Sequence, residues 1–96
     1  MLNTITQAIN NREEISFTYS GLERVAQPCA VGVSTAGNNV LRCFQTQGRH
    51  VTPGHEWDLC TISKISNLKL TGVIFNSNPR GYKPGDKGMQ RIHAQL

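Results

Sequence analysis

The chain has 96 residues, a length typical of one domain with a single core, and its 38% hydrophobic content lies above the disordered range. It carries ten lysine and arginine residues against six acidic residues, a formal net charge of +4. No run of about 18 apolar residues is present, which excludes a membrane-spanning helix.

Residues 1–12 predict a short amphipathic helix. Leu2, Ile5, Ala8 and Ile9 recur at the spacing of one helix face. The two asparagines that follow can end the helix. We expect this helix to pack against the edge of a sheet.

Residues 14–75 are predicted to contain the strands. In ISFTY, residues 15–19, apolar and polar side chains alternate, and a Ser-Gly turn leads into a returning strand that Pro28 should bend or confine to an edge. Further strands are predicted over residues 39–46, 57–65 and 66–75. Both faces of the last two carry apolar residues, which favours a small curved β-barrel of about five strands over an open sheet with one solvated face.

Residues 76–96 are predicted to form an extended C-terminal clasp over this barrel. Its part NPRGYKPGDKG, residues 78–88 and called the basic segment below, has no apolar periodicity, and its Gly and Pro residues fix turns. Arg80, Lys83 and Lys87 stand three and four residues apart. Such a segment can present cations over a pocket, or it can serve only as a structural clasp.

The last residues, MQRIHAQL, alternate apolar and polar side chains and predict a terminal strand. A strand at a chain end invites edge pairing with a neighbouring subunit, so we expect a homodimer or a higher homo-oligomer.

The net charge lies in the C-terminal part of the chain. Residues 1–57 carry four basic and four acidic residues, whereas residues 58–96 carry six basic and two acidic residues. A one-sided positive field favours a polyanionic partner such as a nucleotide or nucleic acid. The alternative is a charge that only keeps the protein soluble.

The cysteine pattern predicts where the protein works. There are three cysteines, an odd number, and the chain begins without a signal peptide. Both features predict reduced thiols and a cytoplasmic protein.

Several stretches, taken in order, resemble a known family. ISFTY, ERVAQP, VLR and FQT, followed by PRGYKPGDKGM at residues 79–89, are similar to the WYL domain, especially to small stand-alone members. The resemblance runs from about residue 2 to the end and implies a single WYL-like domain over residues 1–96 with an SH3- or Sm-like β-barrel. It also implies ligand sensing without catalysis, with nucleotides or nucleic acids as ligands, in bacterial or phage regulators often linked to defence.

Two positions depart from the family pattern. The motif that names the family falls on residues 39–41, Asn-Val-Leu, so its aromatic pair is absent. Asp58 stands where a basic residue is expected after the tryptophan, and an acid there would repel a phosphate.

Arg42 is the first candidate binding residue. It is flanked by Leu41 and Cys43 in a strand that we expect to be central, where an unpaired guanidinium is costly. It either lines a phosphate site, for which the planar guanidinium is well suited, or pairs with Glu23 or Asp58.

The other candidates supply cations, stacking rings and polar contacts. Arginine and lysine side chains of the basic segment would hold phosphates, tyrosines would stack on bases, and Gln45 would read polar edges. For Phe44 and Trp57, core packing is the favoured interpretation. The complete set of candidate ligand-binding residues is Arg42, Gln45, Arg80, Tyr82, Lys83, Lys87, Tyr19, Lys64 and Arg49.

The stretch GRHVTPGHE, residues 48–56, predicts either a flap that closes over a ligand or a variable surface loop. It contains Arg49, His50 and His55. The two histidines and Cys60 lack the close, paired spacing of zinc ligands, so we expect no metal and no cofactor.

Motifs of catalysis are missing from the sequence, and we expect no enzyme. The first hypothesis is a regulatory module that binds a nucleotide or a short single-stranded nucleic acid on a basic face. Sequestration of a nucleotide second messenger in phage–bacteria conflict is one version, suggested by the family resemblance. The alternative is a protein-interaction subunit that docks an acidic partner protein without a nucleotide.

Overall fold

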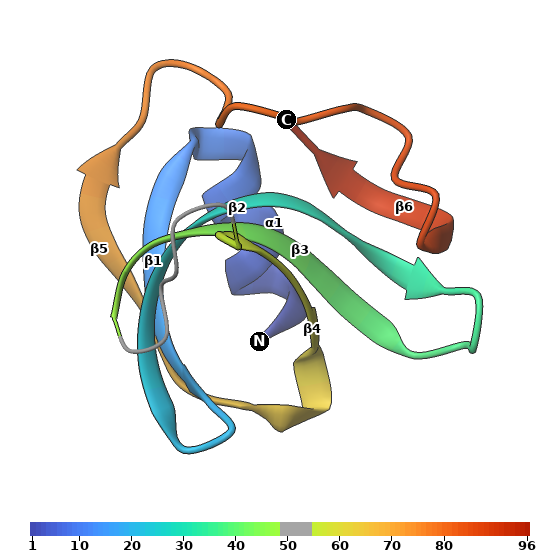
Figure 1. The fold of residues 1–96 in the computed structure, drawn as a ribbon, viewed down its shortest axis with the longest axis horizontal. Coiled ribbons are helices and arrows are strands. Elements are labelled where there is room, and N and C mark those ends of the chain that lie inside the picture. The colour runs from blue at the N-terminus through green and yellow to red at the C-terminus, as the bar shows by residue number, and fades with distance from the viewer. Residues whose placement is uncertain (49–54) are drawn as a thin grey trace.

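The computed structural model describes residues 1–48 and 55–96 (Figure 1). A short N-terminal helix is followed by strands, so the predicted mainly β class with a leading helix is confirmed. The elements are α1 (Leu2–Asn11), β1 (Glu13–Tyr19), β2 (Leu22–Ser34), β3 (Asn39–Gly48), β4 (Trp57–Thr61), the short 3-10 helix η1 (Ile62–Lys64), β5 (Ile65–Ile74) and β6 (Met89–Gln95).

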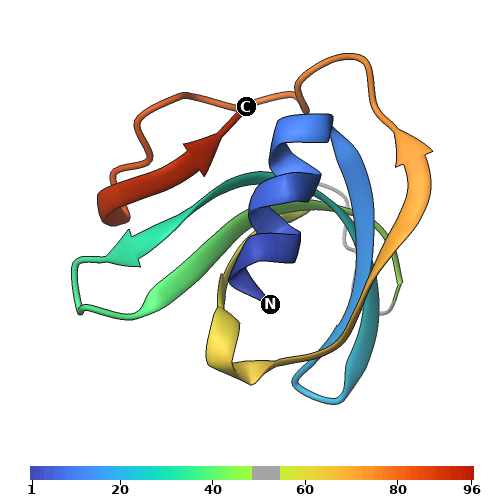
Figure 2. The same cartoon turned by 180° about the vertical axis from the view of Figure 1, so that it is seen from behind.

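All strand pairs are antiparallel, and five strands follow the order β4-β3-β2-β1-β5. The sixth, β6, pairs with β2. The sheet is strongly curved, as Figures 1 and 2 show, but it is not closed: β4 and β5 remain its two ends. The closed barrel expected from the sequence is therefore not established by the strand pairing.

The long strand β2 changes partner along its length. It pairs with β1 up to Ala26 and with β6 from Ala30 onward, while β3 runs along its other edge. Pro28 lies between the two regions, next to a register shift against β3. Proline has no N–H to donate, so its position suits the place where one partner ends and the next begins.

The terminal strand β6 pairs inside its own chain. Gly32 of β2 faces Ile92 of β6, and a Cβ added at Gly32 would overlap the backbone carbonyl of Arg91. Glycine therefore permits the close approach of the two strands. This in-chain pairing differs from the pairing with a neighbouring subunit that was expected for the terminal strand.

The core lies between α1 and the concave side of the sheet, as the view from behind shows (Figure 2). Ile5, Ala8 and Ile9 of α1 are buried against Ile15 and Phe17 of β1, among others. The helix face and the strand alternation predicted from the sequence are thus the packed faces. Within the described residues, no helix has the length and apolar character needed to cross a membrane.

The connection from β5 to β6 is fixed to the end of α1. Arg12, the residue after the helix, accepts a hydrogen bond from the Phe75 N–H at its carbonyl oxygen, 2.9 Å. Its guanidinium Nη1 donates to Oδ1 of Asn78 at 2.6 Å. These contacts hold the start of the basic segment, which then crosses toward β3 and β4.

Candidate functional site

The basic segment and the strands β2, β3 and β4 enclose a hollow of about 400 Å³. Ala30, Arg42 and Trp57 form the strand side of its wall, and residues 81–87 form the other side. Sites for small molecules are usually concave and of this order of volume. The hollow is therefore the first candidate for a ligand site.

Hydrogen bonds along the basic segment hold this wall in place. The indole Nε1 of Trp57 donates to the carbonyl oxygen of Arg80 at 3.1 Å, and the Tyr82 hydroxyl donates to the carbonyl oxygen of Leu96 at 3.0 Å. Between these anchors, Gly81 has a φ of 83°, and a Cβ there would lie 3.2 Å from the indole nitrogen. Glycine at this position both permits the turn and leaves room for the tryptophan.

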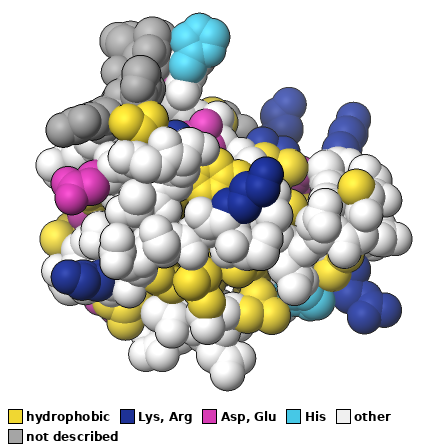
Figure 3. Space-filling view, turned by 90° about the horizontal axis from the view of Figure 1, so that it is seen from below, with side chains coloured by type: hydrophobic (Ala, Val, Ile, Leu, Met, Phe, Trp, Pro, Cys, Tyr) yellow, Lys and Arg dark blue, Asp and Glu magenta, His cyan; other side chains and the backbone are white. Residues whose placement is uncertain are grey.

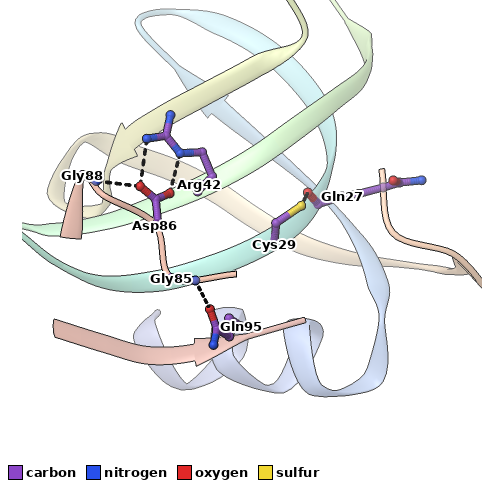
Figure 4. A network of polar contacts seen from close by, with 7 residues as sticks. All are labelled: Gln27, Cys29, Arg42, Gly85, Asp86, Gly88 and Gln95. Atoms are coloured by element: carbon purple, nitrogen blue, oxygen red, sulfur yellow. Dashed lines mark hydrogen bonds and ion pairs between the residues drawn. The ribbon is translucent and has the colours of Figure 1, made fainter. Parts of the chain in front are cut away.

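Arg42 and Asp86 join the middle of β3 to the basic segment (Figure 4). Arg42 Nε donates to Oδ2 of Asp86 at 2.7 Å, and its Nη2 donates to Oδ1 at 3.2 Å. The Gly88 N–H donates to the same Oδ1 at 2.8 Å. The ion pair considered for Arg42 thus exists, but its partner is Asp86 and neither Glu23 nor Asp58.

This pairing changes the titration of both side chains. The hydrogen bond from Arg42 lowers the pKa of Asp86 from its ordinary value of 3.8, against an opposing effect of burial. The same hydrogen bond raises the pKa of Arg42, so the guanidinium keeps its charge throughout the acid range.

The stability of the protein is expected to fall when Asp86 is protonated. Because the pKa of Asp86 is lower in the folded chain, its contribution is fully present above the ordinary aspartate pKa and is lost as the pH falls through the folded value. Urea unfolding at several pH values below about 5 measures this loss. Asp86→Asn should show a smaller loss over the same range, and an identical pH dependence in both proteins would contradict the assignment.

The cations left without a counter-ion define the electrostatics of the hollow. Among the described residues, ion pairs join Arg24 to Asp58, Arg42 to Asp86 and Arg80 to Glu56. Lys83 and Lys87 line the hollow, are exposed and form no ion pair with any described residue. With Arg42, Lys83 and Lys87 against Asp86, the described residues of the lining carry three positive charges and one negative charge, a net of +2.

Two aromatic rings complete the lining. Trp57 is half-buried and meets Phe44 edge-on, with ring centroids 5.3 Å apart and an interplanar angle of 75°. Tyr82 lines the hollow from the basic segment. The interpretation of Trp57 as a core residue is therefore incomplete, because the ring packs against Phe44 and also borders the hollow.

A second hollow, of about 520 Å³, shares no described lining residue with the first. Gln45 and Arg80 line it together with Phe44, Glu56 and residues 77–79. Gln45 is only 3% exposed and donates to the Gln47 carbonyl oxygen at 3.2 Å, and Arg80 pairs with Glu56 at 2.8 Å. The structure thus places these two candidates beside the first hollow but not in it.

Tyr19 and Lys64 lie away from both hollows. The Tyr19 hydroxyl accepts a hydrogen bond from the Thr61 N–H at 3.0 Å, and the Arg24 guanidinium lies over its ring. Lys64 is exposed on η1. Arg49 and most of the predicted flap lie outside the described residues.

The three cysteines are free and buried. Burial raises the pKa of Cys29 to about 12, and its Sγ donates to the Gln27 carbonyl oxygen at 3.3 Å. The pKa of Cys43 is raised well above its ordinary value, chiefly by a hydrogen bond with Cys60 and secondly by burial. Cys29 and Cys43 are therefore protonated at neutral pH and are poor nucleophiles. Within residues 1–48 and 55–96, no cluster of metal-binding side chains is found.

No protein-family model, curated protein or solved structure matches this chain. The site therefore has to be interpreted from its own geometry. Sequence analysis had brought out four residues of the hollow, Arg42, Tyr82, Lys83 and Lys87, and had missed Trp57 and Asp86 as parts of it. The sequence offered one signal for the role of Asp86: it is the only acidic residue in the basic segment.

Proposed function

We propose that this protein is a non-catalytic regulatory module that binds a phosphate-bearing ligand, a nucleotide or a short single-stranded nucleic acid, in the hollow beside the basic segment. The observation that carries the proposal is the lining: an arginine and two lysines with no ion-pair partner in the described part of the chain stand next to two aromatic rings in one concavity. Ammonium and guanidinium groups bind phosphate oxygens through charge-assisted hydrogen bonds. Aromatic faces stack on bases of any sequence.

The size of the hollow favours a small ligand over a long polymer. A volume of about 400 Å³ accommodates a molecule of nucleotide size. On the face seen in Figure 3, basic side chains stand apart from one another, with uncharged and hydrophobic side chains between them. That face lacks the continuous basic stripe with which proteins follow a long phosphate backbone.

The proposed setting of this activity is supported by the family resemblance and by the free thiols. The resemblance to the WYL family supports an SH3- or Sm-like barrel as the parent fold of the curved sheet, and a role in phage–bacteria defence, such as sequestration of a nucleotide second messenger. The free thiols support a cytoplasmic protein.

Titration of the protein with single nucleotides tests the proposal. Trp57 is the only tryptophan of the chain and borders the hollow, so its fluorescence reports ligand binding there directly. A nucleotide that binds should change this fluorescence and raise the melting temperature by an amount that grows with the logarithm of its concentration relative to Kd. A panel of nucleotides and short oligonucleotides that changes neither quantity, at low salt, would refute the proposal.

A second candidate function is the docking of a protein partner. The edge strand β5 exposes large apolar side chains, among them Val73 and Ile74, each 53% exposed. Unpaired edges with apolar side chains are sites of strand addition, by a partner or by a second copy of this chain. Binding through β5 would be insensitive to nucleotide and would leave the fluorescence of Trp57 unchanged.

A further inference from the structure

The contact between Arg42 and Asp86 has the form of an occupied anion site. Three N–H groups converge on the Asp86 carboxylate: Arg42 Nε at 2.7 Å, Arg42 Nη2 at 3.2 Å and the Gly88 amide at 2.8 Å. Two oxygens of a phosphate group present the same acceptor pair to a guanidinium fork as a carboxylate does. The donors that hold Asp86 are therefore donors that can hold a phosphate.

Asp86 also lies where a ligand would meet it. Of the described residues that line the hollow, it is the only acid, and Lys83 and Lys87 belong to the same lining. Figure 4 shows the carboxylate reaching from the basic segment to Arg42 on β3. A phosphate that approaches the lysines thus meets a negative charge on the arginine it would otherwise bind.

We propose that Asp86 is an internal anion of this site: it occupies the subsite of one ligand phosphate, and binding exchanges the carboxylate for that phosphate on Arg42 and Gly88. This inference rests on the proposed function. With Asp86 turned away, the hollow would carry three positive charges in place of a net of +2. A phosphate with two negative charges gains more from this field than a carboxylate with one.

The exchange gives the site a means of regulation. Arg42 and Asp86 tie the basic segment to β3, so displacement of Asp86 removes this tie, while the Gly85 N–H still donates to Oε1 of Gln95 on β6 at 3.0 Å (Figure 4). Gly85 adjoins Asp86, has a φ of 73° and open space where a Cβ would stand, and permits the backbone to turn. Ligand binding would then alter the surface that the protein presents to a partner. The apparent affinity for the ligand would be lower than that of a site without Asp86, because the carboxylate has to be displaced first.

The decisive experiment compares Asp86→Asn with Glu23→Gln by calorimetric titration with inorganic pyrophosphate. Both variants lose one negative charge, but Glu23 is exposed on β2 and does not line this hollow. The asparagine keeps an acceptor oxygen for Gly88 and lacks the charge that competes for Arg42. We expect Asp86→Asn to bind pyrophosphate roughly tenfold more tightly than the parent, because no carboxylate then competes with the ligand for Arg42. Glu23→Gln should bind pyrophosphate like the parent.

The other outcomes separate the two proposals. Equal binding by both variants and the parent overturns the exchange and leaves the binding site in place. Weaker binding by Asp86→Asn also overturns the exchange, because Asp86 would then position Arg42 for the ligand. If no protein of the three binds pyrophosphate or any nucleotide, the proposed function fails and the exchange fails with it.

A measurement on the unmodified protein covers the case in which Asp86→Asn does not fold. A crystal structure of the parent with bound pyrophosphate is expected to show phosphate oxygens on Arg42 and the Gly88 amide, with the Asp86 carboxylate turned away. Pyrophosphate bound at the lysines while Asp86 still pairs with Arg42 through both nitrogens would overturn the exchange.

Discussion

Replacement of Lys83 and Lys87 together by alanine is expected to weaken nucleotide binding about a hundredfold and to leave the fold intact. Each lysine would form a charge-assisted hydrogen bond to a ligand phosphate, worth about 1.5 kcal/mol, so the loss of both amounts to roughly 3 kcal/mol. Both side chains are exposed and neither has an ion-pair partner within the described part of the chain. Titration of the fluorescence of Trp57 measures the affinity, and thermal unfolding checks the fold.

The matched control is Lys64→Ala with Lys69→Ala. This variant removes the same charge from residues that do not line the hollow, Lys64 on η1 and Lys69 on β5. Its affinity should stay close to that of the parent, apart from a small general effect of net charge that salt suppresses. Equal losses in the two double variants would mean that the protein attracts anions by overall charge and has no site in the hollow.

Substitution of Gly32 by alanine is expected to destabilise the protein by about 3 kcal/mol, which corresponds to a fall in melting temperature of roughly 12–24 °C for a domain of this size. The new Cβ would overlap the backbone carbonyl of Arg91, and backbone of a paired strand cannot turn aside as a side chain can. The strand β6 must therefore move away from β2, and the Tyr82 hydroxyl then loses its acceptor at Leu96.

Gly37→Asn serves as the control for this prediction. Gly37 lies in the turn between β2 and β3 with a φ of 88°, and its Cβ position has open space around it. Asparagine tolerates this left-handed conformation better than most residues, so the expected cost is about 1 kcal/mol or less. A Gly32→Ala variant as stable as Gly37→Asn would show that β6 does not pack on β2 as closely as the structure has it.

Local patterns in the sequence account for much of the fold. The helical spacing of Ile5, Ala8 and Ile9 and the alternation of Ile15 and Phe17 identify the faces that the structure buries. These patterns can be predicted because the period of an element is a property of consecutive residues. The same holds for the basic segment, whose glycines and prolines mark it as neither helix nor strand.

Contacts between distant parts of the chain could not be predicted in this way. Arg42 required a partner, yet Asp86 lies 44 positions away, and nothing in the sequence favours it over Glu23 or Asp58. Whether β6 pairs with β2 of the same chain, and whether the sheet closes, depends equally on how the connections cross in space.

The sequence by itself determined the class of elements, their buried faces and the gathering of positive charge near the C-terminus, because each of these is a property of neighbouring residues. Only the tertiary structure decided which cations remain unpaired. Arg24, Arg42 and Arg80 each meet a carboxylate brought from another part of the chain, while Lys83 and Lys87 meet none among the described residues. Pairing depends on distance in space, and the path of the backbone sets that distance.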